Sequence, residues 1–218
     1  MNDNLDRFSI GYMLDTNFGP YARPEPGPDT IKECVDQLID EGVLAEQVGF
    51  EGIFVPERHM RTETMFPNPL MLLAALAVKT ERVRLGTFAL IPSYGWNPMQ
   101  LAESTALVDQ ISGGRLTLVV AMGVLEDSWR MFAVNGAHRL SLFTESIEVL
   151  KKAWTSQEPF SFEGKRFQFD NVHLTPKPYQ QNPHPTLWGG GQIEAAIKRA
   201  GTYASICPPP HNVGWGFC

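Results

Sequence analysis

Short apolar runs alternate with amphipathic stretches along most of the chain. Apolar runs of four to eight residues bounded by turn signals are typical of buried strands, and apolar residues at three- and four-residue spacing are typical of helices. The pattern predicts strands at residues 8–14, 52–55, 83–91, 116–122 and 186–188. It predicts helices at residues 30–48, 69–79, 98–111, 126–132, 138–154 and 192–200, with Asp29 or Thr30 as the cap of the first. Residues 203–206 are interpreted as the start of a sixth strand.

Strands that alternate with helices across short turns indicate a parallel sheet. Two segments depart from the alternation: residues 160–169 have the period of two of a β-hairpin, and prolines 176, 178, 183 and 185 indicate an extended linker. We therefore predict an α/β fold, a TIM (β/α)₈-type barrel that is incomplete, with five to six βα units and an inserted β-hairpin. A complete barrel typically needs about 250 residues, and we expect a C-terminally truncated chain. The predicted division is a partial barrel at 1–206 and an irregular tail rich in proline and glycine at 207–218.

Composition narrows the functional classes. The net charge is −6 with both signs interspersed, which argues against nucleic acid as a partner. The first residues lack the order of a signal peptide, and the longest apolar stretches, such as 70–78, are too short to span a membrane. We expect a cytoplasmic protein without a membrane partner. Cys34, Cys207 and Cys218 are widely spaced, no H-E-x-x-H occurs, and no metal is predicted.

Several sequence segments, taken in their order along the chain, resemble those of one protein family. They are Val-Arg-Leu-Gly-Thr at 83–87, Leu-Val-Asp-Gln-Ile-Ser-Gly-Gly-Arg-Leu at 107–116, and the region 160–191. At barrel spacing this set resembles the bacterial luciferase-like superfamily of flavin-dependent monooxygenases and coenzyme F420-dependent oxidoreductases, over roughly residues 7–203. The resemblance implies a TIM barrel and an oxidoreductase.

Catalytic candidates follow the second predicted strand, because barrel active sites lie at the C-terminal ends of strands. They are Glu57, Arg58 and His59. In flavin-dependent members of the family this loop often reads Glu-His-His, and the first histidine serves the flavin. Arg58 replaces that histidine, which argues against luciferase-type base chemistry and suits an anionic group. The alternative is a structural Glu57–Arg58 pair with His59 packed beneath the loop.

Cofactor candidates follow the later strands. The resemblance implies a cis peptide bond at Phe88–Ala89, against which the flavin or deazaflavin packs; the alternative is a plain strand. Met122 stands where some members of the family have a phosphate-binding arginine. The glycines after the fifth predicted strand are interpreted as a phosphate cradle or as a tight turn; the residues are Gly189, Gly190, Gly191 and Gln192.

Tyr94, Trp96 and Asn97 follow the third predicted strand. They are predicted to line a pocket for a small-molecule substrate, or to serve a homodimer interface.

The leading functional hypothesis is a monooxygenase acting on paired donors with incorporation of molecular oxygen. Reduced FMN would come from a partner flavin reductase, and the substrate would be a small organic molecule. The alternatives are hydride transfer with coenzyme F420 and an inactive truncated fragment of either enzyme.

Overall fold

Strands and helices alternate along the computed structural model, which describes residues 10–17, 24, 26–62, 64, 66–189 and 194–203. In chain order the elements are β1 (Gly11–Met13), α1 (Pro28–Gln47), β2 (Gly52–Val55), α2 (Pro69–Ala77), β3 (Arg84–Thr87), the 3₁₀ helix η1 (Pro92–Tyr94), α3 (Pro98–Ser112), β4 (Leu116–Val120), α4 (Glu126–Met131), the 3₁₀ helix η2 (Gly136–His138), α5 (Arg139–Thr155), β5 (Phe160–Glu163), β6 (Gln168–Val172), β7 (Thr186–Gly189) and α6 (Glu194–Tyr203).

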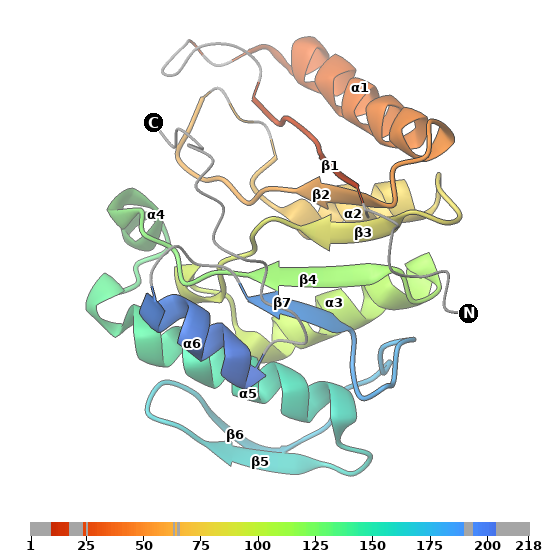
Figure 1. Cartoon of the computed structure of the whole chain (residues 1–218). Coiled ribbons are helices and arrows are strands. Elements are labelled where there is room, and N and C mark those ends of the chain that lie inside the picture. The colour runs from red at the N-terminus through yellow and green to blue at the C-terminus, as the bar shows by residue number, and fades with distance from the viewer. Residues whose placement is uncertain are drawn as a thin grey trace.

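The main sheet has five strands in the order β1-β2-β3-β4-β7, and every pair is parallel. Helices connect successive strands, so the carboxyl ends of all five strands lie at one edge of the sheet (Figure 1). This arrangement confirms the predicted α/β fold and is that of an incomplete barrel.

The inner face of the sheet is concave. Phe54 on β2 and Trp188 on β7 stack with ring centroids 5.9 Å apart, although β3 and β4 lie between their strands. A glycine on β3 allows this approach, since a Cβ at Gly86 would lie 2.5 Å from the Phe54 ring. The sheet therefore curls around an interior that aromatic rings already fill.

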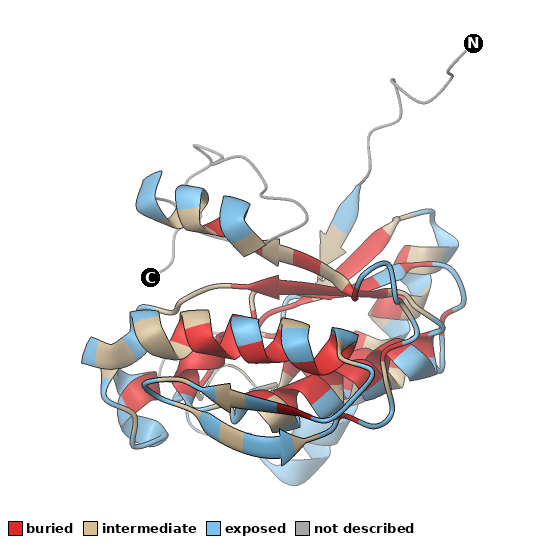
Figure 2. Ribbon diagram, turned by 90° about the horizontal axis from the view of Figure 1, so that it is seen from below, coloured by how far each residue is buried: buried red, intermediate tan, exposed pale blue. Residues whose placement is uncertain are grey.

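The outer face of the sheet carries the main core. Ile53, Leu85 and Leu118 alternate with the inward-facing positions and are fully buried. They pack on helices such as α2 and α5, and Figure 2 shows helices with one buried and one exposed side. Burying each large apolar side chain contributes about 1.5–3 kcal/mol to folding, so this layer holds the strands in place.

The predicted hairpin is confirmed as the antiparallel pair β5–β6. Its turn is fixed to α5, because the Glu145 carboxylate accepts the backbone N–H groups of Lys165, Arg166 and Phe167 at 2.8–3.2 Å. The linker to β7 contains two cis prolyl bonds, before Pro176 and before Pro183.

Several predicted boundaries are wrong; β4 ends at Val120 and α2 at Ala77, each two residues before the predicted end. The third predicted strand ends early, because β3 stops at Thr87 and the chain turns at Phe88 before Leu90 bridges to β4. Helix α1 begins at Pro28 after Gly27, so Asp29 lies in its first turn instead of capping it. Tyr203 is the last residue of α6 and does not begin a strand.

Several sequence predictions lie outside the described residues, including residues 204–206 of the expected sixth strand, the 207–218 tail, Cys207 and Cys218. Cys34 is buried on α1. Across the described ranges, no helix combines the length and hydropathy needed to cross a bilayer. In the same part of the chain no cluster of three or more candidate metal ligands occurs.

Candidate functional site

Glu57 is a buried carboxylate in the loop that follows β2. Its side chain is 1% exposed. Oε2 accepts the backbone N–H of Ile91 at 2.5 Å, and Oε1 accepts Nε2–H of His59 and Nε1–H of Trp96, each at 2.9 Å. Three N–H donors compensate for the water that this carboxylate loses on burial. Glu57 thereby joins the loops after β2 and β3.

One ring nitrogen of His59 is hydrogen-bonded to Glu57, and the other has no partner within the described part of the chain. The ring packs edge-on against Phe132 and Tyr94, with centroids 4.8 and 5.9 Å away. Because Glu57 accepts the hydrogen on Nε2, a neutral His59 presents Nδ1 as a lone-pair acceptor. Nδ1 is buried, and no hydrogen-bond partner for it occurs among the described residues.

Glu57 and His59 face a pocket of about 340 Å³ at the carboxyl edge of the sheet. Two of its sides are helix N-termini. The side chain of Asn68 caps α2 by accepting the N–H of Leu70, and that of Asn97 caps α3 by accepting the N–H of Met99. The lining consists of Glu57, His59, Pro67, Asn68, Tyr94, Gly95, Trp96, Asn97, Gln100, Met131 and Phe132.

The pocket contains five of the residues predicted from sequence: Glu57, His59, Tyr94, Trp96 and Asn97. Sequence reasoning missed Asn68, Met131 and Phe132. The signal for Asn68 was present, because Asn-Pro occurs at the start of both helices; nothing in the local sequence indicated that α4 would lie over the same pocket.

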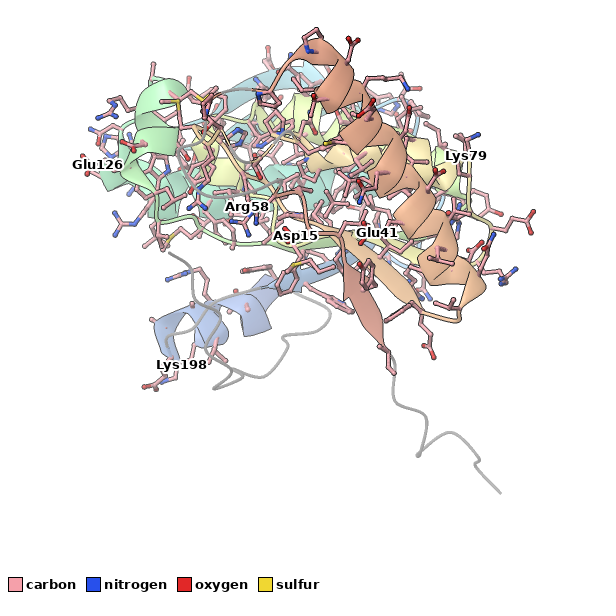
Figure 3. All side chains as sticks on the ribbon, turned by 90° about the horizontal axis from the view of Figure 1, so that it is seen from above. Asp15, Glu41, Arg58, Lys79, Glu126 and Lys198 are labelled. Carbon is pink, nitrogen blue, oxygen red and sulfur yellow. The ribbon has the colours of Figure 1, made fainter. Side chains whose placement is uncertain are left out.

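Arg58 does not belong to the described lining of this pocket. It lies between Glu57 and His59 in an extended loop. Figure 3 shows it near the middle of that view, whereas Glu126 and Lys198 lie at the periphery. The structure therefore separates Arg58 from the two residues with which it was grouped.

A second surface lies on the concave face of the sheet, at the mouth of the partial barrel. The peptide bond Phe88–Ala89 is cis, as the family resemblance predicts. The Phe88 ring is 44% exposed and meets Phe54 edge-on at 6.2 Å. Trp188 stacks on Phe54, and within the described part of the chain its buried Nε1 has no hydrogen-bond partner. We call Phe54, Phe88 and Trp188 the aromatic face. Ala89 packs instead on the small cluster of Ile91, Tyr94 and Trp129.

The phosphate candidates are only partly described. Met122 packs against the main core, and its carbonyl accepts the Ser93 hydroxyl at 2.6 Å. A Cβ at Gly189 would lie 2.4 Å from Cβ of Ala200, so packing of α6 on β7 requires this glycine. Gly190, Gly191 and Gln192 lie outside the described residues.

The chain belongs to the luciferase-like monooxygenase family, whose model matches residues 10–207. The concave aromatic face and the pocket at the carboxyl edge thus lie on the fold of this family. Monooxygenase RslO1 from Streptomyces bottropensis superposes with a TM-score of 0.79 at 27% identity, over 88% of this chain and 56% of that one.

Curated relatives include users of two different cofactors. The oxygenase component of the flavin-dependent trigonelline monooxygenase of Acinetobacter baylyi is 33% identical over 73% of this chain and 44% of its own length. The F420-dependent glucose-6-phosphate dehydrogenase of Amycolatopsis mediterranei is 29% identical over 75% of this chain and 51% of its own length. The chain spans about half the length of these relatives.

Proposed function

We propose that this chain carries the cofactor-facing part of a flavin-dependent monooxygenase that uses reduced FMN, molecular oxygen and a small organic substrate. The observation that carries the proposal is the aromatic face, which lies at the mouth of the partial barrel in a member of the luciferase-like family. The trigonelline monooxygenase relative, named as an oxygenase component, supports a partner flavin reductase.

The aromatic face suits the flat ring system of a flavin. Phe88 offers an exposed ring, and Trp188 offers an N–H donor that lacks a partner among the described residues. Aromatic rings stack favourably on flat π-systems, and a buried N–H gains from finding an acceptor. Phe54, Phe88 and Trp188 would hold the ring, and the phosphate group is proposed to lie near Gly190, Gly191 and Gln192.

Reduced FMN, when bound, supplies the electrons with which oxygen is activated and one oxygen atom is inserted into the substrate. The protein's own contribution is positioning. Glu57 fixes the orientation of His59 and Trp96 through two hydrogen bonds. The rings of Tyr94 and Phe132 surround His59 and keep water from its buried Nδ1.

A second function, hydride transfer with coenzyme F420, is favoured by one observation. Arg58 stands where flavin-dependent relatives often carry histidine, and a guanidinium suits an anionic cofactor or substrate. The F420-dependent dehydrogenase relative supports this alternative. A third alternative is that the chain alone has no activity, because it spans about half of these relatives. A homodimer is proposed for either enzyme.

Anaerobic titration of the folded chain with reduced FMN and, separately, with F420 tests the proposal. We expect saturable binding of reduced FMN that weakens about tenfold in Trp188→Leu, a loss of roughly 1.4 kcal/mol. Tyr179→Leu removes an aromatic ring that is 61% exposed in the linker and is the matched control. Binding of F420 alone would favour the second function, and binding of neither cofactor by a folded chain would favour the third.

A further inference from the structure

Aromatic rings and a buried negative charge meet in the pocket beside Glu57. Tyr94, Trp96 and Phe132 contribute rings to its lining, Met131 contributes a thioether, and Glu57 contributes a carboxylate. Among the described residues that line the pocket there is no lysine or arginine. The faces of aromatic rings are electron-rich, so the rings and the carboxylate both attract positive charge. The composition of the lining therefore favours a cationic occupant.

The charge of Glu57 acts on the pocket without direct contact. Its side chain is 1% exposed, so we do not expect an occupant to bond to the carboxylate. Trp96 transmits the charge, because its Nε1–H is 2.9 Å from Oε1 of Glu57 and hydrogen-bonded groups polarise one another. An indole that donates to a carboxylate has a more electron-rich ring. Trp96 is half-buried and lines the pocket, so this ring lies beside the occupant.

The neighbouring imidazole does not cancel the charge of Glu57. Nε2–H of His59 is donated to Glu57, and within the described part of the chain the buried Nδ1 has no hydrogen-bond partner. A second proton, on Nδ1, would be a buried donor without an acceptor, which is costly. The ring is therefore neutral, and the pair of Glu57 and His59 keeps a net negative charge.

The most accessible part of the wall comes from the end of α4. Met131 is 52% exposed and Phe132 is 39% exposed, and both line the pocket. An occupant can therefore reach both side chains as they stand. A cation within about 6 Å of the centroid of such a ring is attracted to its face. The interaction thus depends on exposed side chains and not on a buried atom.

The pocket offers little to the N–H groups of an ordinary ammonium ion. Asn68 and Asn97 use their side-chain oxygens to cap α2 and α3. The oxygens of Glu57 are buried and already accept three N–H groups. An ammonium ion that left water for this pocket would lose hydrogen bonds that these groups do not replace. A quaternary ammonium group has no N–H to satisfy, and aromatic rings recognise it.

The rim of the pocket has the opposite polarity and limits where the cation can lie. The N-termini of α2 and α3 carry partial positive charge. Asn97 and Gln100 at the start of α3 are exposed, so water screens this charge, whereas Glu57 is buried. We therefore expect the cationic group beside Trp96 and Phe132, with a hydroxyl or another acceptor group of the same molecule at the rim.

We propose that this pocket binds small quaternary ammonium compounds that carry a hydroxyl or another acceptor group, and that the rings of Trp96 and Phe132 select them. Both residues then determine specificity. That such a compound is the substrate rests on the proposed function, whereas the binding preference itself does not.

The test compares three probes by calorimetric titration of the chain without cofactor. Choline is the cationic probe, 3,3-dimethylbutan-1-ol has the same shape without the charge, and ethanolamine has the charge but carries N–H groups. We expect choline to bind about tenfold more tightly than either of the others. Attraction to the net charge of −6 alone would give choline and ethanolamine equal affinities. That result, equal affinities for choline and the alcohol, or no binding of choline would overturn the inference.

A variant tests the role of the accessible ring. Phe132→Leu removes the ring and keeps an apolar wall, so the preference for choline over the alcohol should fall about threefold or more. Phe167→Leu, the same change in the turn between β5 and β6, should leave the preference intact. An unchanged preference in a folded Phe132→Leu variant would contradict the assignment.

A second measurement does not depend on the folding of a variant. In the unmodified chain, the N-methyl protons of bound choline should show nuclear Overhauser effects to the ring protons of Trp96 and Phe132. Ring currents should also move the N-methyl resonance upfield. Bound choline without these contacts would place the cation elsewhere and overturn the inference.

The two proposals fail separately. A choline preference without binding of reduced FMN leaves the pocket assignment and removes the proposed function. Binding of reduced FMN without a choline preference removes the pocket assignment alone.

Discussion

The two ends of the sheet use charged side chains in different ways. At the amino ends of the strands, Glu46 accepts the backbone N–H groups of Glu81, Arg82 and Val83, at 2.7–3.1 Å. Arg115 lies at the same end and donates to backbone carbonyls of the loops around it, which are those of Ala77, Thr80, Val83 and Ser112. At the carboxyl ends, Glu57 mainly orients side chains.

The difference indicates that the amino ends of the strands stabilise the fold, whereas the carboxyl ends retain polar atoms that can bind a ligand. Glu46 and Arg115 tie loops together with charge-assisted bonds, which are the strong ones. At the other end of the sheet, Nδ1 of His59 and Nε1 of Trp188 remain without partners among the described residues. In barrels the amino-terminal face serves stability and the carboxyl-terminal face serves chemistry.

The largest expected effect comes from removing the hydrogen bonds of Arg115 at the amino ends of the strands. Arg115→Met should lower the free energy of unfolding by about 3 kcal/mol, because several buried carbonyls lose a charged donor. Chemical denaturation measures this loss. Arg130→Met, at an exposed i,i+3 pair with Asp127, should change stability by less than about 0.5 kcal/mol. Similar losses in both variants would contradict the comparison.

A smaller effect is expected at Glu46, and it depends on pH. Burial by itself raises the pKa of this carboxyl, but the N–H groups of Val83, Arg82 and Glu81 outweigh burial and hold the pKa below its ordinary value. A carboxyl with a lowered pKa stabilises the fold above its unfolded-state pKa and loses that contribution as pH falls through the folded value.

Glu46→Gln should therefore lower stability by about 1–2 kcal/mol at neutral pH and by less in acid. Denaturation curves at several pH values measure this difference. A constant difference across the acidic range would show that the charge of Glu46 is not what holds the loop.

The smallest effect on stability is expected on the aromatic face. Trp188→Phe removes an N–H that has no partner in the described part of the chain and keeps a ring against Phe54. We expect the free energy of unfolding to change by less than about 1 kcal/mol, because deleting an unsatisfied donor offsets the lost ring area. A larger loss, measured by denaturation of the free chain, would mean that the indole serves the fold and not a ligand.

The order and type of most elements could be predicted from sequence, because apolar runs such as Gly52–Val55 and the Leu- and Ala-rich α2 are short and bounded by turn signals. The stacking of Phe54 on Trp188 could not, since it depends on how far the sheet curls. Local sequence does not say which ring lies over Gly86.

The candidate site shows the same limit. Position at strand ends was sufficient to nominate Glu57, His59 and Trp96, which the structure brings together. The same reasoning also nominated Arg58, which does not line that pocket and whose role stays a prediction. Their roles in chemistry remain predictions that the binding experiments address.

Gly86 has a consequence for any protein built by extending this sheet. Because Gly86 has no side chain, the Phe54 ring can lie across β3. The ring then fills the middle of any barrel that additional strands would form. Added strands would close around a solid centre, so even a completed barrel would have no lumen for a ligand to pass through. Variation in what such proteins bind would then arise from the loops and the aromatic side chains at one rim.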